Sequence, residues 1–304
     1  MPHRRKHRWL AVALLPATSE AFWAAHEVAS DGRVWWHVWR LDPTFLLPIA
    51  VLAWCYVRGL RSWPERSRAH PRWRTVSFFI GVALLVLAQE SPLDRLAGQQ
   101  LTFHMAQHEV VMMLAVPAML LGAPTTPVLR GMPRWLRQGL IRRVAGSALG
   151  RGAYRTLTSP VAGATAFIAT VWAWHLVPGW YDAALRTPWL HVTQHATFAF
   201  AATLFWWNVI EAPPHRPRLE AMPRVLYLMA VGALKDGAAA LIVFASVPLY
   251  SEYAHIVRIL PWSSLRDQQI GGLVMWVPGT VVMLAAAGAT FLAWFGESST
   301  PVEG

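Results

Sequence analysis

The feature that most constrains this chain is a series of long apolar segments separated by short, arginine-rich connections. A helix of about 20 apolar residues crosses the hydrocarbon core of a bilayer. Lipid-exposed spans are helices or closed barrels, and the alternating pattern of barrel strands is absent here. The sequence therefore predicts an all-α polytopic membrane protein, a bundle of seven transmembrane helices at about residues 44–60, 75–90, 101–122, 160–178, 189–210, 223–247 and 269–295.

Composition supports a membrane protein and argues against a nucleic-acid partner. Apolar residues make up 55% of the chain and charged residues 14%, where soluble domains carry about 25% charged residues. The formal net charge is +11, but the arginines lie in separate short connections and form no continuous basic face. We therefore expect contact with a lipid bilayer and none with nucleic acid. Cys55 is the single cysteine, which excludes an internal disulfide, and we expect it to pack inside its apolar segment.

The placement of arginine predicts the orientation of the bundle. Alternate connections carry sixteen arginines, namely Arg58, Arg61, Arg66, Arg68, Arg72, Arg74, Arg130, Arg134, Arg137, Arg142, Arg143, Arg151, Arg155, Arg216, Arg218 and Arg224. The connections on the other side carry four, namely Arg95, Arg186, Arg258 and Arg266. Because cytoplasmic loops are enriched in Lys and Arg, we predict that the first transmembrane helix starts outside and that the C-terminus is cytoplasmic.

The two ends of the chain are predicted to lie outside the bundle. Residues 1–25 have a basic start and a short apolar run, and so resemble a signal peptide or a weak uncleaved anchor. Either interpretation places residues 26–43 outside the cytoplasm, as an outer N-terminal segment. Residues 44–295 then form the membrane domain, and residues 296–304 form a cytoplasmic tail.

The longest connection, at about residues 127–159, has two interpretations. Apolar residues alternate with arginine at helical spacing there, namely Trp135, Leu136, Leu140, Ile141 and Val144. One interpretation is an amphipathic helix on the cytoplasmic leaflet, and the other is a solvated basic loop that only sets the topology.

Five histidines fall at the predicted outer ends of three helices. His104 and His108 open the third helix, and His191 and His195 open the fifth with the same four-residue spacing. Residues four apart share one face of a helix. His175 closes the fourth helix, which runs in the opposite direction and so ends at the same surface. A single such histidine can simply bond a neighbouring helix, but five at one depth predict a metal or haem site.

The residue types make copper the first choice of metal. Imidazole suits zinc, copper, iron and nickel, whereas thioether selects Cu(I). Met105 adjoins His104, and Met112 lies near the face of His104 and His108. These two methionines are either auxiliary ligands or core packing. Haem ligated by histidines from different helices is the alternative cofactor.

Four charged residues also fall in or beside the predicted spans. Glu109 follows His108, and an ionised carboxylate is costly at that depth. It either neutralises a bound cation or is protonated. Lys235 and Asp236 lie near the middle of the sixth helix. Adjacent residues point about 100° apart, so we expect no simple pairing between these two, and we hypothesise a contact between Glu109 and Lys235. Asp267 is predicted to cap the seventh helix and to border the site.

Several blocks of residues, in this order, resemble the bacterial family of caa3-type cytochrome c oxidase assembly factors. They are Ser91-Pro92-Leu93-Asp94, His104-Met105-Ala106-Gln107-His108, Leu121-Gly122-Ala123-Pro124, Trp174-His175, Tyr181-Asp182-Ala183-Ala184-Leu185, His191 to His195, Phe205-Trp206-Trp207, Asp267-Gln268-Gln269 and Met275-Trp276-Val277-Pro278-Gly279. Glu109 departs from the family pattern, where an apolar residue is expected.

The resemblance implies a non-enzymatic protein of the bacterial plasma membrane that helps to mature a haem–copper oxidase. It implies copper bound by His104, His108, His175, His191 and His195 and delivered to oxidase subunits on the outer side. Two rival functions stay open on the sequence alone. One is a haem-binding electron-transfer protein, and the other is a copper transporter, which requires polar groups that continue through the bundle.

Overall fold

The computed structural model describes residues 39–64, 70–256 and 259–298, and these residues form helices and no strands. The predictions for residues 1–25 and for most of the outer N-terminal segment lie outside the described residues. The helices are α2 (Pro43–Arg61), α4 (Arg72–Glu90), α5 (Pro92–Gln99), α6 (Leu101–Glu109), the π-helix η2 (Val110–Ala115), α7 (Val116–Leu121), α8 (Thr125–Gly131), the π-helix η3 (Leu136–Ile141), α9 (Arg142–Gly146), α10 (Ala148–Leu157), α11 (Pro160–Leu176), α12 (Trp180–Arg186), α13 (Pro188–Trp207), α14 (Ala221–Phe244), α15 (Glu252–His255) and α16 (Ser264–Ser298).

Long helices occur at all seven predicted positions, but not all of them are long and apolar enough to be assigned as spans by themselves. Among the described residues, five helices meet both conditions: α2, α4, the continuous α6–η2–α7, α14 and α16. Helix α11 has 17 residues and gives a sixth span only together with α10, to which it is bent by 60°. Helix α13 is long enough, but His191, Gln194 and His195 lower its hydropathy. The chain is therefore a multi-pass helical membrane protein, and the count of seven spans stays a prediction.

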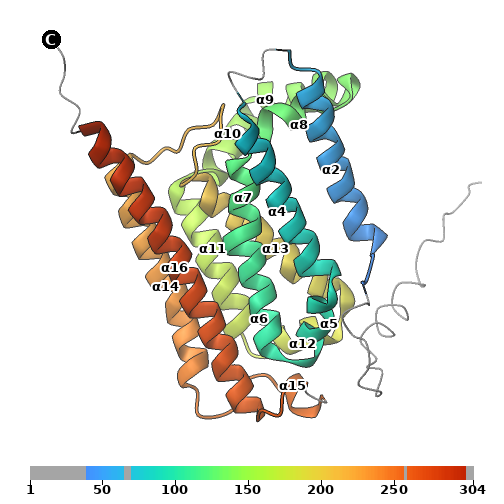
Figure 1. Ribbon diagram of the computed structural model, residues 1–304, viewed down its shortest axis with the longest axis vertical. Helices are drawn as coiled ribbons and strands as arrows, with labels where there is room; N and C mark the ends of the chain where they lie inside the picture. Colours follow the sequence, from blue (N-terminus) through green and yellow to red (C-terminus); the bar gives the residue numbers. More distant parts are fainter. Residues whose placement is uncertain (1–38, 65–69, 257–258, 299–304) are drawn as a thin grey trace, which may run out of the picture. The chain divides into compact units, whose positions relative to one another are not determined.

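The α6–η2–α7 helix is the centre of the bundle (Figure 1). In the most apolar 18-residue stretch of this helix, 67% of the residues are buried inside the protein. In the corresponding stretches of the other four spans, at most 39% of the residues are buried. Helix α4 packs along one side of it, with Gly81 allowing close approach to Ala115 and Met119. On the remaining sides lie α13 and α16, and α14 runs along α16 (Figure 1). A residue on α6 is therefore surrounded by protein rather than by lipid.

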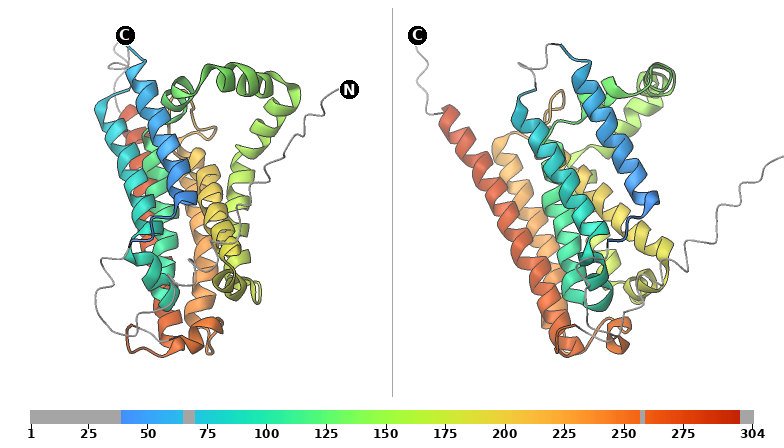
Figure 2. Two further views of the ribbon diagram at one scale, coloured as in Figure 1. Left: turned by 90° about the vertical axis from the view of Figure 1, so that its right-hand side faces the viewer. Right: turned by 45° about the vertical axis from the view of Figure 1, so that its right-hand side comes forward.

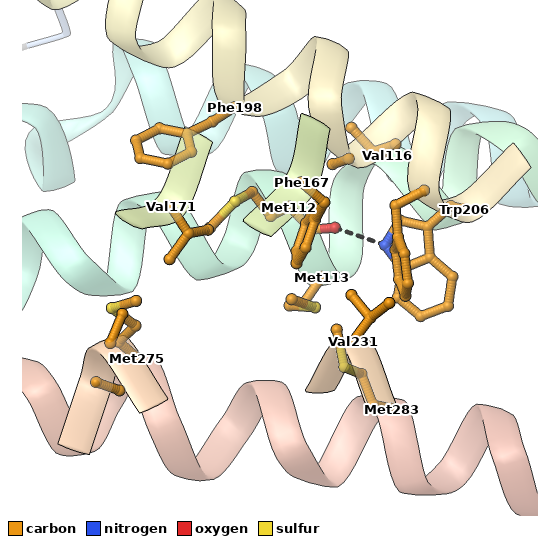
Figure 3. Close-up of a cluster of buried hydrophobic side chains, with 14 of the residues drawn as sticks. Met112, Met113, Val116, Phe167, Val171, Phe198, Trp206, Val231, Met275 and Met283 are labelled. Carbon is orange, nitrogen blue, oxygen red and sulfur yellow. Dashed lines mark hydrogen bonds between the residues drawn. The ribbon is translucent and has the colours of Figure 1, made fainter. Parts of the chain in front are cut away.

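The π-helical turn in the central helix follows from Pro117. Proline has no N–H to donate and its ring clashes with the carbonyl four residues before it. The Val116 N–H bonds to Val111 O instead of to Met112 O. Pro117 has no N–H and so cannot donate to Met112 O in place of Val116. The freed Met112 carbonyl accepts a hydrogen bond of 2.9 Å from the indole N–H of Trp206 on α13, as Figure 3 shows. The buried carbonyl is thereby satisfied, and α13 is held against the central helix.

Helix α2 is attached mainly to α8. Gly59 lies against the backbone of Pro127, and Gly131 lies against the carbonyl of Cys55, so a side chain at either glycine would collide with backbone. Tyr56 stacks on Phe78 of α4 at 3.8 Å between ring centroids. Cys55 is buried in this contact, which confirms the packing role expected for it.

The connecting helices divide between the two ends of the bundle (Figures 1 and 2). Helices α5, α12 and α15 lie at one end, and α8, α9 and α10 lie at the other. The long arginine-rich connection is thus largely helical, as the amphipathic interpretation predicts. Its contact with a membrane stays a prediction, as does the orientation of the bundle across one.

Candidate metal centre

The start of α6 positions His104 and His108, and Asp267 of α16 fixes where that start lies. The Asp267 carboxylate accepts hydrogen bonds from the backbone N–H groups of Leu101 and Thr102, at 2.8 and 3.1 Å, and from the Thr102 hydroxyl at 2.7 Å. The first N–H groups of a helix need such external acceptors. The prediction that Asp267 caps its own helix is therefore wrong, because α16 already begins at Ser264 and Asp267 caps its neighbour.

His175 lies near the C-terminal end of α11, and the next helix, α12, packs against α11. The His175 ring donates from Nδ1 to the carbonyl of Val171, at 2.8 Å. Its Nε2 atom is therefore the nitrogen with the lone pair, and it is buried without a hydrogen-bond partner. Tyr181 of α12 lies between the histidines of two helices, with ring centroids 5.6 Å from His175 and 5.2 Å from His104.

The start of α13 contributes His191 and His195 on one face. Their Nε2 atoms lie 3.1 Å apart. The Nδ1 atom of His195 accepts from the side-chain amide nitrogen of Gln89 on α4, at 2.8 Å. The Nε2 atom of His195 therefore carries the proton and donates to His191 Nε2, so the tautomer of His195 must change before its Nε2 atom can bind a metal.

The structure brings all five predicted histidines into one buried cluster, which we call the histidine cluster: His104, His108, His175, His191 and His195. The ring centroids of neighbouring members lie 4.5–5.7 Å apart. Three members, His104, His108 and His195, place one nitrogen each within 4.8 Å of the others. Two nitrogens bonded to one ion lie at most about 4.2 Å apart, since each metal–nitrogen bond is about 2.1 Å. A slight inward rotation of the rings would therefore let all three reach one ion.

His108 lies at the middle of the histidine cluster and has the least satisfied ring. It is 2% exposed, and neither of its nitrogens has a hydrogen-bond partner. It contacts His104, His175 and His195 through its ring. Buried polar groups are nearly always hydrogen-bonded, so an imidazole in this state is suited to receive a ligand.

His104 is oriented by Tyr253 of α15, a residue that no motif in the sequence marks. The Tyr253 hydroxyl donates to the carbonyl of Ala97 at 2.7 Å, so it accepts from the Nδ1–H of His104 at 2.9 Å. The Nε2 atom of His104 is then the unprotonated nitrogen. Burial raises the pKa of Tyr253 well above its ordinary value, so the hydroxyl stays neutral and keeps donating to Ala97.

Further polar contacts that sequence analysis did not predict hold the ends of these helices together. Gln107, between the two histidines of α6, donates to Asp94 of α5 at 3.0 Å. Asp182 of α12 accepts from the hydroxyl of Ser251 at 2.6 Å. Asp94 and Asp182 both lie in blocks that resemble the family, so the resemblance marked these two carboxylates. It did not indicate which residues they bond. Tyr253 and Gln89 lie in none of those blocks.

The two predicted auxiliary methionines lie in the apolar core. Met105 packs toward Gly271 of α16. Met112 lies in the core cluster with Val171 and Phe198 (Figure 3). Core packing is therefore the role that the structure supports for both.

Glu109 and Lys235 contact each other, which confirms the hypothesis of a pairing between α6 and α14. Lys235 Nζ lies 3.7 Å from Glu109 Oε1 and donates to the carbonyl of Met275 at 2.7 Å. It also lies 3.3 Å from Asp236. The expectation that adjacent Lys235 and Asp236 do not pair is therefore wrong, because the long lysine side chain spans the angular separation. Thr280 of α16 donates to the other Asp236 oxygen at 2.7 Å.

A cavity of about 280 Å³ reaches the histidine cluster from the space between α2, α4 and α13. His191 and His195 form part of its wall, together with the carboxylates of Glu90 and Asp42. Apolar side chains such as Phe45 make up much of the rest. The cavity thus gives a route by which a small ion can approach two of the five histidines.

These features define a multi-pass helical membrane protein with five buried histidines gathered at one end of its bundle. The chain belongs to the cytochrome c oxidase caa3 assembly factor family, whose model matches residues 54–297. The family resemblance inferred from the sequence is thereby confirmed.

Three mycobacterial relatives carry no assigned function of their own. Uncharacterized proteins of Mycobacterium bovis and Mycobacterium tuberculosis are each 26% identical over 252 residues, which cover 79% of this chain and 36% of the relative. One of Mycobacterium leprae is 25% identical over 265 residues, with 82% and 38% covered. The chain thus spans less than half the length of these relatives. No solved structure matches it.

Proposed function

We propose that this protein helps to assemble a haem–copper cytochrome c oxidase by binding copper at the histidine cluster and passing it to an oxidase subunit. Membership of the assembly factor family supports the role in assembly. The observation that carries the copper proposal is His108, whose two ring nitrogens are buried without hydrogen-bond partners amid three other imidazoles. The role is non-catalytic, since the protein would carry the ion without changing it.

The donor set favours copper among the metals that imidazole binds. Nitrogen ligands bind divalent first-row metals in an order that peaks at Cu²⁺. Cys55 lies on α2, outside the cluster, so thiolate ligands play no part. With Met105 and Met112 in the core, the first ligands are His104, His108 and His195. His175 offers its unpaired Nε2 as a fourth.

The arrangement of His191 and His195 suits release as well as binding. Their Nε2 atoms are 3.1 Å apart, so one can replace the other as a ligand with little movement. Both also line the cavity of about 280 Å³. We propose that copper enters and leaves through this cavity past the carboxylate of Glu90, since the Asp42 carboxylate is already paired with Arg40 at 3.3 Å.

The structure favours this proposal over the two rival functions. The imidazole rings contact one another at 4.5–5.7 Å, which leaves no gap for a haem macrocycle between them. A transporter needs polar groups that continue through the bundle. Beside Glu109, Lys235 and Asp236, much of the described interior is filled by apolar side chains such as Met113, Phe167 and Trp206 (Figure 3).

We propose, on the basis of the positive-inside rule, that the histidine cluster lies on the outer side of a bacterial plasma membrane. The arginine-rich helices α8, α9 and α10 lie at the opposite end of the bundle (Figure 1). Copper would then be handed over outside the cytoplasm. Cysteine accessibility labelling at exposed positions of α10 and α15, in intact cells, tests this orientation: only α15 should react with an impermeant reagent.

Metal analysis of the purified protein tests the copper proposal. Wild-type protein loaded with copper and then desalted should retain about one ion per chain, and the His104→Ala/His108→Ala double variant should retain almost none. His255→Ala is the matched control, because His255 is exposed on α15 at the same end of the bundle. Equal copper in the wild type and the double variant would refute the proposal.

A further inference from the structure

The connection between α7 and α11 forms an arch of short helices, made of α8, η3, α9 and α10. Figure 2 shows this segment curving away from the bundle before α10 leads back into α11. The return is sharp, since α10 and α11 meet at 60°. The arch lies at the end opposite the histidine cluster, and no step of the copper proposal uses it.

A large, open apolar pocket lies along the arch. Its volume is about 800 Å³, and it is lined by Leu140, Ile141, Val144, Ala145, Gly150, Arg151, Tyr154, Arg155 and Arg218. Ligand pockets in proteins range from about 300 to 1,000 Å³, so this cavity is large enough for a sizeable apolar group. Leu140 and Val144 are more than half exposed, which is costly for a surface that faces water.

Three arginines and, among the described residues, no acidic side chain border this apolar space. Arg151, Arg155 and Arg218 form no ion pair among the described residues. Arg218 is held in place, because it donates to the carbonyl of Arg155 at 2.8 Å and to the hydroxyl of Thr158 at 2.9 Å. Arg151 donates to the carbonyl of Gly146. A guanidinium has five N–H donors, so each of these arginines keeps donors for a ligand.

The geometry points to an anionic phospholipid as the occupant of the arch. We propose that its acyl chains fill the apolar cavity and that Arg151, Arg155 and Arg218 bind its phosphate. Arginine suits phosphate because its planar fork can donate two parallel hydrogen bonds. Clusters of basic residues next to a membrane span attract anionic lipids of the cytoplasmic leaflet. An acidic protein segment would satisfy the arginines but would leave the apolar wall exposed.

Native mass spectrometry of the full chain tests this proposal, with phosphatidylglycerol and phosphatidylcholine of identical acyl chains as probes. Wild-type protein should retain phosphatidylglycerol in preference to phosphatidylcholine. The Arg151→Gln/Arg155→Gln/Arg218→Gln variant should lose that preference by about tenfold or more. The matched control is Arg134→Gln/Arg142→Gln/Arg143→Gln, which removes the same charge from the same segment at exposed positions outside the cavity.

A separate variant tests the apolar wall and guards against misfolding of the triple variant. Leu140→Gln/Val144→Gln leaves all arginines in place and should weaken retention of both lipids. Size-exclusion profiles and helix content must match the wild type for each comparison. Equal retention of the two lipids by the wild type would overturn the proposal, as would a control variant that loses the preference equally. Tighter binding of an acidic peptide than of phosphatidylglycerol would also overturn it.

Discussion

Lys235 places its ammonium nitrogen 3.7 Å from a carboxylate oxygen of Glu109, linking the middle of α14 to the turn of α6 that carries His108. The lysine is fully buried, and removing one partner of a buried ion pair leaves an uncompensated charge. We therefore regard this pair as the structural support beneath the histidine cluster, separate from the cluster itself.

Replacing Lys235 should destabilise the protein strongly. Lys235→Met leaves two carboxylates, Glu109 and Asp236, close together without a cation, and the expected loss is about 3–5 kcal/mol. Glu109→Gln should cost less, because Asp236 still lies 3.3 Å from the ammonium. Thermal unfolding in detergent measures both, and the exchanged pair Glu109→Lys/Lys235→Glu should recover part of the loss. An exchanged pair no more stable than Lys235→Met would contradict a direct pairing.

A side chain at Gly279 should disturb the same pair, because the Lys235 ammonium lies against this glycine. A Cβ atom there would collide with the Lys235 ammonium and approach the Glu109 carboxylate. Gly279→Ala is expected to cost about 1–3 kcal/mol of unfolding free energy. Gly288→Ala on the same helix is the control, since nothing lies within 4 Å of its Cβ position, and the helix propensity of alanine should make it neutral or stabilising. Equal effects of the two substitutions would show that Lys235 does not occupy this space.

The hydrogen bond from Trp206 to Met112 should be needed only because Pro117 leaves that carbonyl without a donor. Trp206→Phe is expected to cost about 1–3 kcal/mol beyond the change in packing, the penalty for an unsatisfied buried carbonyl. Pro117→Ala restores a backbone N–H in the same turn. In a double-mutant cycle of unfolding free energies, Trp206→Phe should therefore cost less in the Pro117→Ala background. Strictly additive effects would mean that the π-helical turn has another cause.

Tyr253 should act on copper affinity through the orientation of His104. Tyr253→Phe keeps the ring and removes the hydroxyl that accepts from His104 Nδ1. Loss of such a partner commonly lowers metal affinity by about 10–100-fold. Competition with a copper chelator measures the change. Tyr154→Phe, on exposed α10, is the control and should leave the affinity unchanged. An unchanged affinity in Tyr253→Phe would remove the orienting role.

The sequence predicted the positions of the long helices and the gathering of the five histidines for clear physical reasons. Apolar segments of bilayer length mark helices, and the direction of each helix places its ends. Four-residue spacing on α6 and α13 then puts each histidine pair on one face. Local patterns of this kind carry across to the structure because they depend on residues close in sequence.

The contacts that orient the histidines depend on long-range packing and were not predictable from such patterns. Tyr253 is 149 positions from His104, and Gln89 is 106 positions from His195. Asp267 illustrates the same limit, since it has the residue type of an N-cap but serves α6 rather than α16. The Glu109–Lys235 contact was anticipated only because charges inside spans need partners.

X-ray absorption at the copper edge of the copper-loaded protein distinguishes imidazole from sulfur ligands. We expect three or four imidazole nitrogens at about 2 Å from copper and no dominant sulfur scattering. The imidazole signature should disappear in His104→Ala/His108→Ala and persist in His255→Ala. A spectrum dominated by sulfur, or an unchanged imidazole signature in the double variant, would contradict a copper site built from the histidine cluster.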